Sequence, residues 1–340
     1  MTSVFVTGST GLIGSRVALE LKSIRAVSSV FCLVRNPGHP SAVALKNSGC
    51  DVIQGDVTDK TSLDAAFSSA HPDVVVNCAG VLRTLDKSLY YAVNRDGVKN
   101  ISERALKIGA KVVHISSLAA YGPSLPGKPR LTFPENSIIN TDSDGKPAPV
   151  SDYGRSKLEG NLALVNSGVR YTIVVPSAVY GPRDKDMFFF FKIASMGISV
   201  STPLKRTINL SYLDDVVKVI TLSCVNPATD GKTYYAASPE EYDWEGVCKV
   251  ISSVGDKKRV VRLVFPDFTI LASAYLSEKI TWLLKKRAAT FNIDKAHEML
   301  APSWIAGGSD TTEKELGIRF TDFVTGASKT YNWYKENRWL

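Results

Sequence analysis

The 340-residue sequence has few residues of the types that bind metals or form disulfides. Its four histidines are scattered, so the sequence predicts no metal site. The five cysteines are an odd number without C-x-x-C spacing; they are Cys32, Cys50, Cys78, Cys224 and Cys248. Because their neighbours are mostly apolar, we expect buried free thiols in a reducing compartment, which favours a cytoplasmic protein over a disulfide scaffold.

Long hydrophobic runs are also absent. The longest stretch without Asp, Glu, Lys or Arg is residues 112–127, and it contains two glycines and two prolines. A transmembrane helix needs about 20 apolar residues, so the sequence predicts no membrane span. The first residues, MTSVFVTGSTGLIG, have neither a basic segment nor a long apolar core, and we expect no signal peptide.

The net charge of +8 is unevenly distributed. Residues 257–287 contain eight basic and two acidic residues, a local excess of +6. A nucleic-acid-binding face would need basic residues interleaved with stacking aromatics, and this pattern is missing, so we predict no nucleic-acid partner. The remaining composition, 44% hydrophobic and 22% charged, is typical of a folded protein, and the length suggests about two domains.

Short β-branched runs alternate with longer amphipathic segments in the first half of the chain. The predicted strands are residues 4–7, 29–34, 51–53, 74–77, 112–116 and 171–175. The predicted helices include residues 12–23, 62–67, 90–108 and 151–165. Strands that alternate with helices predict an α/β fold, with a doubly wound parallel sheet of the Rossmann type.

The second half has a less regular pattern. Residues 122–150 are rich in Pro, Gly, Asn and Asp and predict a long loop beside the carboxyl edge of the sheet. A helix is predicted around MFFFFKIASMG, with its phenylalanines mainly in the core. A strand–helix unit at 207–224 and a strand at 233–237 are expected to return to the main sheet. We therefore predict a Rossmann-type domain from residues 1–176 and about 206–237, and a smaller, mainly helical C-terminal substrate domain from about 177–205 and 238–340.

The strongest motif is VFVTGSTGLIGSRV, which places Gly8, Gly11 and Gly14 between a predicted strand and a predicted helix. Small residues let the backbone approach a pyrophosphate, and the helix N-terminus supplies N–H groups and a positive dipole. A glycine triplet alone would be ordinary turn chemistry. In this strand–turn–helix context, it predicts a dinucleotide site that also includes Thr10, Leu12 and Ile13.

The second predicted strand ends in CLVRNP, which bears on the choice of dinucleotide. A cofactor without a 2′-phosphate would want a carboxylate here to bind the ribose hydroxyls. Leu33 and Val34 offer none, whereas Arg35 offers a forked cation suited to a phosphate. We therefore predict NADP (NADPH) over NAD, the alternative being that Arg35 is a solvated residue at a strand end. Arg16 would either assist Arg35 or lie at the surface.

Two motifs suggest proton transfer at the same edge of the sheet. Tyr153 and Lys157 lie four residues apart on one face of a predicted helix, where the ammonium would ease ionisation of the phenol. Such a pair is often only a surface contact. Ser116 and Ser117 strengthen the catalytic interpretation of this pair. They end the preceding strand and could hold a substrate carbonyl while Tyr153 protonates it.

Together these motifs resemble the extended short-chain dehydrogenase/reductases, the epimerase/dehydratase-like family. Further matching segments are GDVTD at 55–59, NCAG at 77–80, SSLAAYG at 116–122, YGRSK at 153–157, PSAVYGP at 176–182 and YLDDVV at 212–217. The resemblance covers essentially the whole chain. It implies catalytic roles for Ser117, rather than Ser116, and for Tyr153 and Lys157. It also places Asp56 and Val57 at the adenine. The other residues it implies at the cofactor are Cys78, Ala79, Gly80, Tyr153, Lys157, Pro176 and Val179.

Two features of the sequence indicate which branch of the family it resembles. Nucleotide-sugar epimerases and dehydratases of this family usually carry Arg-Asp-Phe where this chain has Ile208, Asn209 and Leu210, and here Arg206 lies two residues early. LVRNP and VVPSAVYGP look more like the branch of dihydroflavonol reductases and 3β-hydroxysteroid dehydrogenases. Asn94 matches the family's helix asparagine, with either a catalytic or a helix-bending role.

The sequence therefore predicts an NADP-dependent oxidoreductase that interconverts a secondary alcohol and a ketone. The substrate would be a small molecule, and it could be hydrophobic or lipid-like. The alternatives are a nucleotide-sugar epimerase or dehydratase with tightly bound NAD, and a redox-silent structural subunit.

Residues 268–284 form an apolar segment with basic flanks, within 257–287, that either touches an anionic membrane or is an ordinary helix of the substrate domain. The helices at 90–108 and 151–165 could pair in a homodimer.

Overall fold

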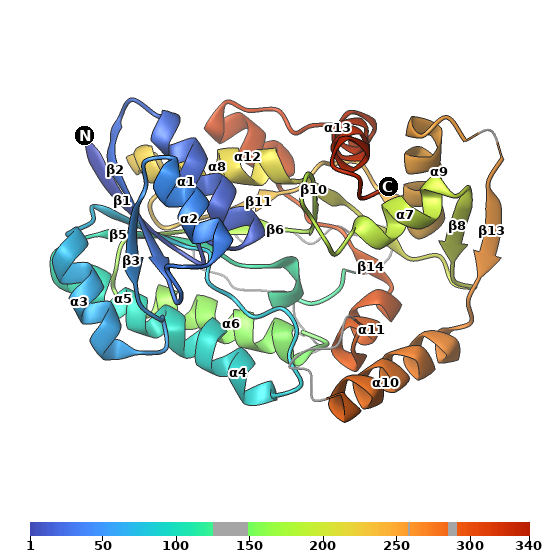
Figure 1. Ribbon diagram of the computed structural model, residues 1–340, viewed down its shortest axis with the longest axis horizontal. Helices are drawn as coiled ribbons and strands as arrows, with labels where there is room; N and C mark the ends of the chain where they lie inside the picture. The colour runs from blue at the N-terminus through green and yellow to red at the C-terminus, as the bar shows by residue number, and fades with distance from the viewer. Residues whose placement is uncertain (125–148, 258, 285–290) are drawn as a thin grey trace.

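The computed structural model describes residues 1–124, 149–257, 259–284 and 291–340 (Figure 1). Its centre is a seven-stranded sheet in the order β11-β6-β5-β4-β1-β2-β3, in which all neighbours are parallel. The strands are β1 (Thr2–Thr7), β2 (Val27–Val34), β3 (Asp51–Gln54), β4 (Val74–Asn77), β5 (Lys111–Ile115), β6 (Tyr171–Pro176) and β11 (Lys232–Ala236). The predicted α/β fold with a doubly wound parallel sheet is confirmed.

Helices cover both faces of this sheet, because successive side chains of a strand point to opposite sides. Val4 and Val6 of β1 pack on one face, whereas Phe5 packs on the other. The first face is covered by α1 (Leu12–Ser23), α2 (Pro40–Asn47), α8 (Leu213–Val225) and α12 (Ser309–Leu316). The second is covered by α3 (Lys60–Ala70), α5 (Gly97–Ile108) and α6 (Asp152–Val165). Two apolar cores therefore hold the strands from either side.

The helix predicted at 90–108 is interrupted by a wider turn. It consists of α4 (Lys87–Tyr91), a π-helical segment at Ala92–Asp96, and α5. The π segment lies against α6, where a Cβ atom at Gly160 would collide with the backbone oxygen of Asn94. Glycine at position 160 therefore lets α6, which carries the predicted catalytic residues Tyr153 and Lys157, approach the π-helical segment closely.

The C-terminal half adds helices and short strands beside the sheet (Figure 1). An aromatic core joins α7 (Phe188–Ser195), α9 (Trp244–Val254) and α13 (Phe323–Glu336). Phe190 and Phe191 are buried there, as predicted for the phenylalanine run. The remaining elements are β7 (Ala178–Tyr180), β8 (Ile198–Ser201), β9 (Thr207–Ile208), β10 (Leu210–Tyr212), β12 (Tyr242–Asp243), β13 (Val261–Val264), α10 (Asp267–Leu283), α11 (Ile293–Leu300) and β14 (Ser303–Trp304).

One part of the predicted topology is wrong. Of the segments expected to return to the main sheet, β11 does so, but β9 and β10 form small separate sheets with β12, β14 and β7. Ser177 explains this placement, because its N–H donates to Ser211 Oγ at 2.9 Å and its Oγ donates to the Asn209 oxygen at 2.7 Å, beyond the end of β6. The domain boundaries remain a prediction, and most of the predicted loop at 122–150 lies outside the described residues.

Candidate active site

The glycine turn between β1 and α1 is closely packed against its own backbone and the end of β4. Gly8 has φ of 63°, and a Cβ atom there would lie 2.5 Å from the carbonyl carbon of Cys78. A Cβ atom at Gly14 would collide with the carbonyl oxygen of Gly8. The first and third glycines are thus required by positive φ and close approach, respectively.

This turn also leaves the N-terminus of α1 open. Gly11 is the N-cap residue and supplies no side-chain hydrogen bond to the first N–H groups of the helix. Thr10 and Gly11 are exposed, while Leu12 and Ile13 are half-buried. Uncapped N–H groups and the helix dipole favour an anion such as a pyrophosphate, so the residues present fit a dinucleotide.

The rim beside β2 holds the residue predicted to select the cofactor. Arg35 directly follows β2 and is exposed, and its guanidinium has no ion pair or hydrogen bond with any residue in the described ranges. Arg16 differs, because its Nη2 lies 2.8 Å from Asp214 Oδ1. Arg35 is therefore available to a ligand phosphate, whereas Arg16 is already paired.

The residues predicted to contact the adenine follow β3. The Asp56 carboxylate accepts hydrogen bonds from the Thr58 N–H at 2.9 Å and the Thr58 hydroxyl at 2.8 Å. Val57 is buried, and its carbonyl oxygen accepts a hydrogen bond from Asn100. These contacts hold the turn in one conformation at the carboxyl end of the sheet.

The strand register brings the other predicted cofactor residues to the same edge. Thr7 of β1 pairs with Asn77 of β4, and Asn77 pairs with His114 of β5. The segment Cys78, Ala79 and Gly80 therefore leaves β4 beside the glycine turn, with the Ala79 N–H bonded to Thr7 Oγ1 at 3.3 Å. Pro176 ends β6, and Val179 lies in β7 just beyond it. A cofactor that begins at Gly8 could thus extend along the strand ends, as ligands of open α/β sheets do.

Helix α6 positions Tyr153 and Lys157. Ser151 caps it, accepting a hydrogen bond from the Gly154 N–H at 2.9 Å. A Cβ atom at Gly154 would collide with the carbonyl oxygen of Ala119, so glycine lets the helix approach the segment after β5. Further along, the buried Lys157 donates from Nζ to the carbonyl oxygen of Ile115 at 2.6 Å. The helix is therefore held on β5 and the segment after it by contacts that follow Tyr153.

The structure distinguishes the two serines after β5. Ser116 is buried, whereas Ser117 is half-buried and interacts with the Tyr153 phenol closely enough to lower the pKa of that phenol. The Ser117 hydroxyl also accepts a hydrogen bond from the Ala119 N–H at 3.2 Å. Ser117 and Tyr153 thus place two hydroxyl groups together at the carboxyl edge of the sheet.

Burial determines the protonation of Tyr153 and Lys157. It raises the pKa of the Tyr153 phenol, and the Ser117 side chain only partly offsets this. We expected the ammonium to ease ionisation of Tyr153, but here burial dominates and the phenol is protonated at neutral pH. Burial also lowers the pKa of Lys157 to about 8, against an opposing effect of Cys78. A protonated phenol suits a proton donor.

The side chain of Asn94 forms hydrogen bonds within the fold. Its amide nitrogen donates to the Val81 oxygen at 3.0 Å and to Ser156 Oγ at 2.9 Å, and its oxygen accepts from the Val81 N–H at 2.8 Å. The side chain, buried in the π-helical turn, therefore ties the segment after β4 to α6.

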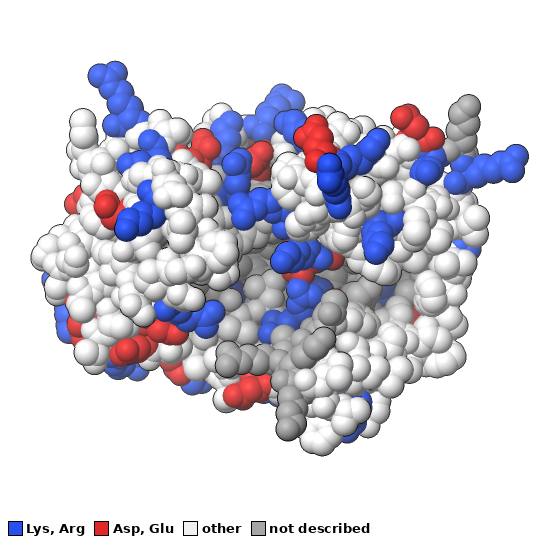
Figure 2. Space-filling view, viewed as in Figure 1, with Lys and Arg blue, Asp and Glu red and all other residues white. Residues whose placement is uncertain are grey.

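Several polar residues near Tyr153 were not predicted from the sequence. Glu298 of α11 accepts a hydrogen bond from Ser151 at 2.8 Å and forms an ion pair with Lys295 at 3.0 Å. Arg83, after β4, forms an ion pair with Asp186, after β7. No motif marks these positions, because the Ser151–Glu298 and Arg83–Asp186 contacts join segments far apart in the chain. Figure 2 shows a central hollow whose walls carry Lys and Arg side chains.

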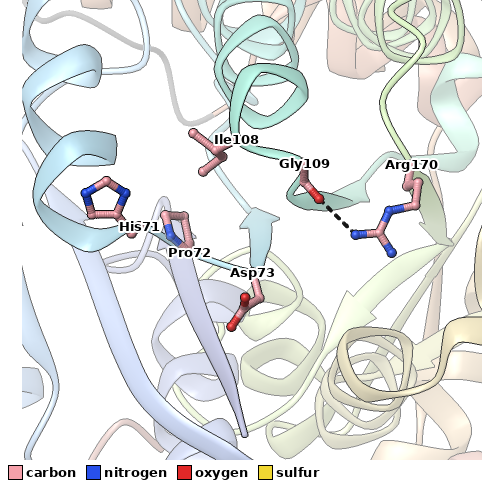
Figure 3. Close-up of a pocket in the computed structure, with 6 residues that line it drawn as sticks. All are labelled: His71, Pro72, Asp73, Ile108, Gly109 and Arg170. Atoms are coloured by element: carbon pink, nitrogen blue, oxygen red, sulfur yellow. Dashed lines mark hydrogen bonds between the residues drawn. The ribbon is translucent and has the colours of Figure 1, made fainter.

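Another hollow lies at the opposite edge of the sheet (Figure 3). It measures about 160 Å³ and is lined by His71, Pro72, Asp73, Ile108, Gly109 and Arg170. These residues precede β4, β5 and β6 or end α5, so they lie at the amino ends of the strands. Asp73 is bonded to Ser3 and Arg170 to the Gly109 oxygen, which gives this hollow a structural explanation.

The fold, together with the residues at the carboxyl edge of its sheet, defines a Rossmann-type dinucleotide-binding enzyme with a Ser–Tyr–Lys group. The model of the NAD dependent epimerase/dehydratase family matches residues 4–237, and the chain belongs to this family. The predicted resemblance is thereby confirmed. Among the described residues, no helix combines the length and apolar character needed to cross a membrane.

Individual relatives differ in their activities. Ceramide reductase from Caulobacter vibrioides is 26% identical, and the alignment covers 99% of this chain and 96% of that protein. UDP-glucose 4-epimerase from Vibrio cholerae is 28% identical over 63% of this chain and 65% of its own length. The relatives of this chain therefore include both a reductase and an epimerase.

Solved structures support the fold. UDP-glucose 4-epimerase from Thermotoga maritima, with UDP-glucose, has a TM-score of 0.73 at 19% identity and covers 98% of this chain and 99% of its own. The Bordetella bronchiseptica enzyme WbmG, in complex with NAD and UDP, has a TM-score of 0.72 at 19% identity, covering 99% and 96%. Such identities show the shared architecture alone.

Proposed function

We propose that this enzyme is an NADP-dependent oxidoreductase that interconverts a secondary alcohol and a ketone. The observation that carries the proposal is the meeting of the Ser117 and Tyr153 hydroxyls beside a lysine bonded to the Ile115 oxygen. Two hydroxyls at one point can hold and protonate the same carbonyl oxygen. A redox-silent subunit would have no physical need for this arrangement.

Each residue of the group has a distinct task. Ser117 donates a hydrogen bond to the carbonyl oxygen of the ketone and orients it. Tyr153 transfers its proton to that oxygen as the alcohol forms, and takes it back in the reverse direction. Lys157 holds α6 on β5 and orients the nicotinamide ribose. The nicotinamide cofactor, when bound along the strand ends, supplies or accepts the hydride.

The preference for NADP rests on Arg35. Its guanidinium is exposed and unpaired among the described residues, and it follows the strand where the adenine ribose would lie. No carboxylate precedes it at Leu33 or Val34. A planar forked cation suits a phosphate dianion, which supports NADPH over NADH.

A hydrophobic, lipid-like ketone is the substrate class we favour. The relative named ceramide reductase covers nearly the whole of both chains, and its name denotes action on a lipid. The relative named UDP-glucose 4-epimerase aligns with less than two thirds of this chain. Full-length similarity includes the C-terminal half, where substrate specificity is expected.

A nucleotide-sugar epimerase with tightly bound NAD is the second candidate, favoured by the Vibrio cholerae relative. It needs a cation near β9 for the phosphates of the sugar nucleotide. Arg206 is buried there and already bonded to the Leu300 oxygen at 2.9 Å and to Asp267 at 2.6 Å. Asn209, which lies within the three residues that replace the usual Arg-Asp-Phe, is bonded to the Ala306 backbone. These contacts favour the ketone reductase.

The two candidates differ in how they hold the cofactor. The purified protein is first denatured and its supernatant assayed for NAD and NADP, and the native protein is then titrated with NADPH and NADH. We expect empty protein, at least tenfold tighter binding of NADPH, and NADPH consumption with hydrophobic ketones. Protein that arrives loaded with NAD and interconverts UDP-sugars without added cofactor would contradict the proposal and support the epimerase.

A further inference from the structure

Helix α10 presents its apolar side chains to solvent. Phe268, Trp282 and Leu283 are 70%, 71% and 73% exposed. At about 3.6 residues per turn, most of the exposed apolar positions of α10 fall on one side of the helix, away from the buried Ala274 and Thr281. We call this side the outer face of α10; it comprises Phe268, Leu271, Tyr275, Leu276, Trp282 and Leu283.

The inner face of α10 is made mostly of small and polar residues. Ala274 and Thr281, seven residues apart, are its buried positions. At one end, Asp267 forms an ion pair of 2.6 Å with Arg206, and nearer the other end Glu278 accepts a hydrogen bond from the Ile293 N–H at 3.0 Å. This polarity is the reverse of a helix on a soluble protein, whose apolar stripe faces the core.

Strand β13 extends this apolar surface. It pairs with β8 and leads through residues 265–266 directly into α10, at the right-hand end of Figure 1. Its exposed apolar residues are Val261, Leu263 and Val264, followed by Phe265. In Figure 2 the lower right of the molecule, where α10 lies in Figure 1, is almost free of charged side chains.

Most of the unpaired charges around this surface are positive. Lys257 and Arg259 precede β13, are exposed, and form no ion pair with any residue in the described part of the chain. Lys279 lies between the apolar residues of α10, with its ammonium 5.3 Å from the centre of the Tyr275 ring. The two acidic residues of α10, Asp267 and Glu278, are engaged on the inner side. Cations beside an aromatic and aliphatic stripe are complementary to anionic lipid headgroups above acyl chains.

We propose that the outer face of α10, together with β13, docks on the surface of an anionic membrane. The apolar side chains enter the boundary between headgroups and acyl chains, and Lys257, Arg259 and Lys279 contact lipid phosphates. A second copy of the chain fits the outer face of α10 less well than a membrane does. A two-fold interface through this face would bring the unpaired cations of both copies together without acidic partners.

Docking there would bring the membrane close to the catalytic helix. Helix α10 packs on α11, whose Glu298 is bonded to Ser151, the N-cap of α6. This placement suits a substrate that partitions into bilayers. The docking itself is independent of the proposed function, since it requires neither cofactor nor substrate.

The experiment is flotation of the full chain with vesicles of phosphatidylcholine, with or without phosphatidylglycerol. We expect co-flotation with the anionic vesicles at low salt, weakened as salt rises. The double variant Phe268→Ser, Trp282→Ser should bind at least about tenfold more weakly. A matched variant, Val43→Ser, Val324→Ser, removes two exposed apolar side chains from α2 and α13 and should bind like the wild type. Circular dichroism confirms that each variant is folded.

A second readout reports the depth of Trp282. Bromine-labelled acyl chains should quench tryptophan fluorescence of the wild type, and Trp282→Phe should lose most of this quenching while still floating. Absence of wild-type flotation at low salt, or equal flotation of the α10 and control variants, would overturn the proposal. A wild-type dimer that the α10 variant converts to monomer, without vesicle binding, would assign the face to a second copy instead.

Discussion

The ammonium of Lys157 donates a 2.6 Å hydrogen bond to the carbonyl oxygen of Ile115, the last residue of β5. The bond joins the helix that carries Tyr153 to the strand that leads into Ser117. The two hydroxyls proposed to act on the substrate, those of Ser117 and Tyr153, are therefore both positioned by the end of β5. This relationship makes the proton-transfer group testable one residue at a time.

Replacement of Tyr153 by Phe removes the proposed proton donor and little else. We expect turnover to fall by about two to four orders of magnitude, as for other general acids, with NADPH affinity changed less than about threefold. Ser117→Ala should lower turnover less, because Tyr153 remains. Tyr91→Phe, a change on the outer helices, serves as the control. Steady-state kinetics and fluorescence titration measure both quantities, and retained turnover in Tyr153→Phe would refute the assignment.

Arg35 should determine the choice of dinucleotide. Arg35→Ala is expected to weaken NADPH binding at least tenfold, about 1.4 kcal/mol, and to leave NADH binding nearly unchanged. The matched change Arg16→Ala removes an exposed ion pair with Asp214, worth about 1 kcal/mol or less of stability, without altering the NADPH to NADH ratio. Parallel titrations of the three proteins test this, and equal effects of both substitutions would contradict it.

Gly14 should be indispensable to the turn. The methyl group of Gly14→Ala would meet the Gly8 carbonyl oxygen, so the turn must open, at an expected cost of about 1–3 kcal/mol and a loss of affinity for both cofactors. At Gly38 the nearest atom to an added Cβ is the Asn36 side chain, at 3.3 Å. Gly38→Ala should therefore bind cofactor normally. Urea unfolding and titration with NADPH separate the two cases.

The lowered pKa of Lys157 predicts a pH dependence of stability in the cofactor-free protein. Its pKa is about 8 in the fold and about 10.4 in the unfolded chain, so between these values the unfolded state binds more protons. The free energy of unfolding should thus rise with pH, by about 2 kcal/mol from pH 7 to pH 9.5 relative to Lys157→Met. Urea unfolding of both proteins at the two pH values measures this difference. Parallel stability curves would show that Lys157 titrates normally.

Local signals in the sequence were sufficient for much of the sheet and helix order. The apolar runs around Val4 and Val74 and the glycines after them mark β1, β4 and the cofactor turn. Helix α2 was missed although Pro40 stands at its first position, because the segment is short and weakly amphipathic. The π-helical turn was missed because it depends on the contact of Asn94 with Gly160, which belongs to another helix.

The sequence by itself determined the fold class, the glycine turn and the types of residue at the reaction centre, since these depend on local periodicity and on backbone conformation at single positions. The tertiary structure decided that Arg16 and Arg206 are paired while Arg35 is free among the described residues. It also decided that α10 turns its apolar side outward. These outcomes depend on contacts between segments distant in the chain, and no local pattern encodes them.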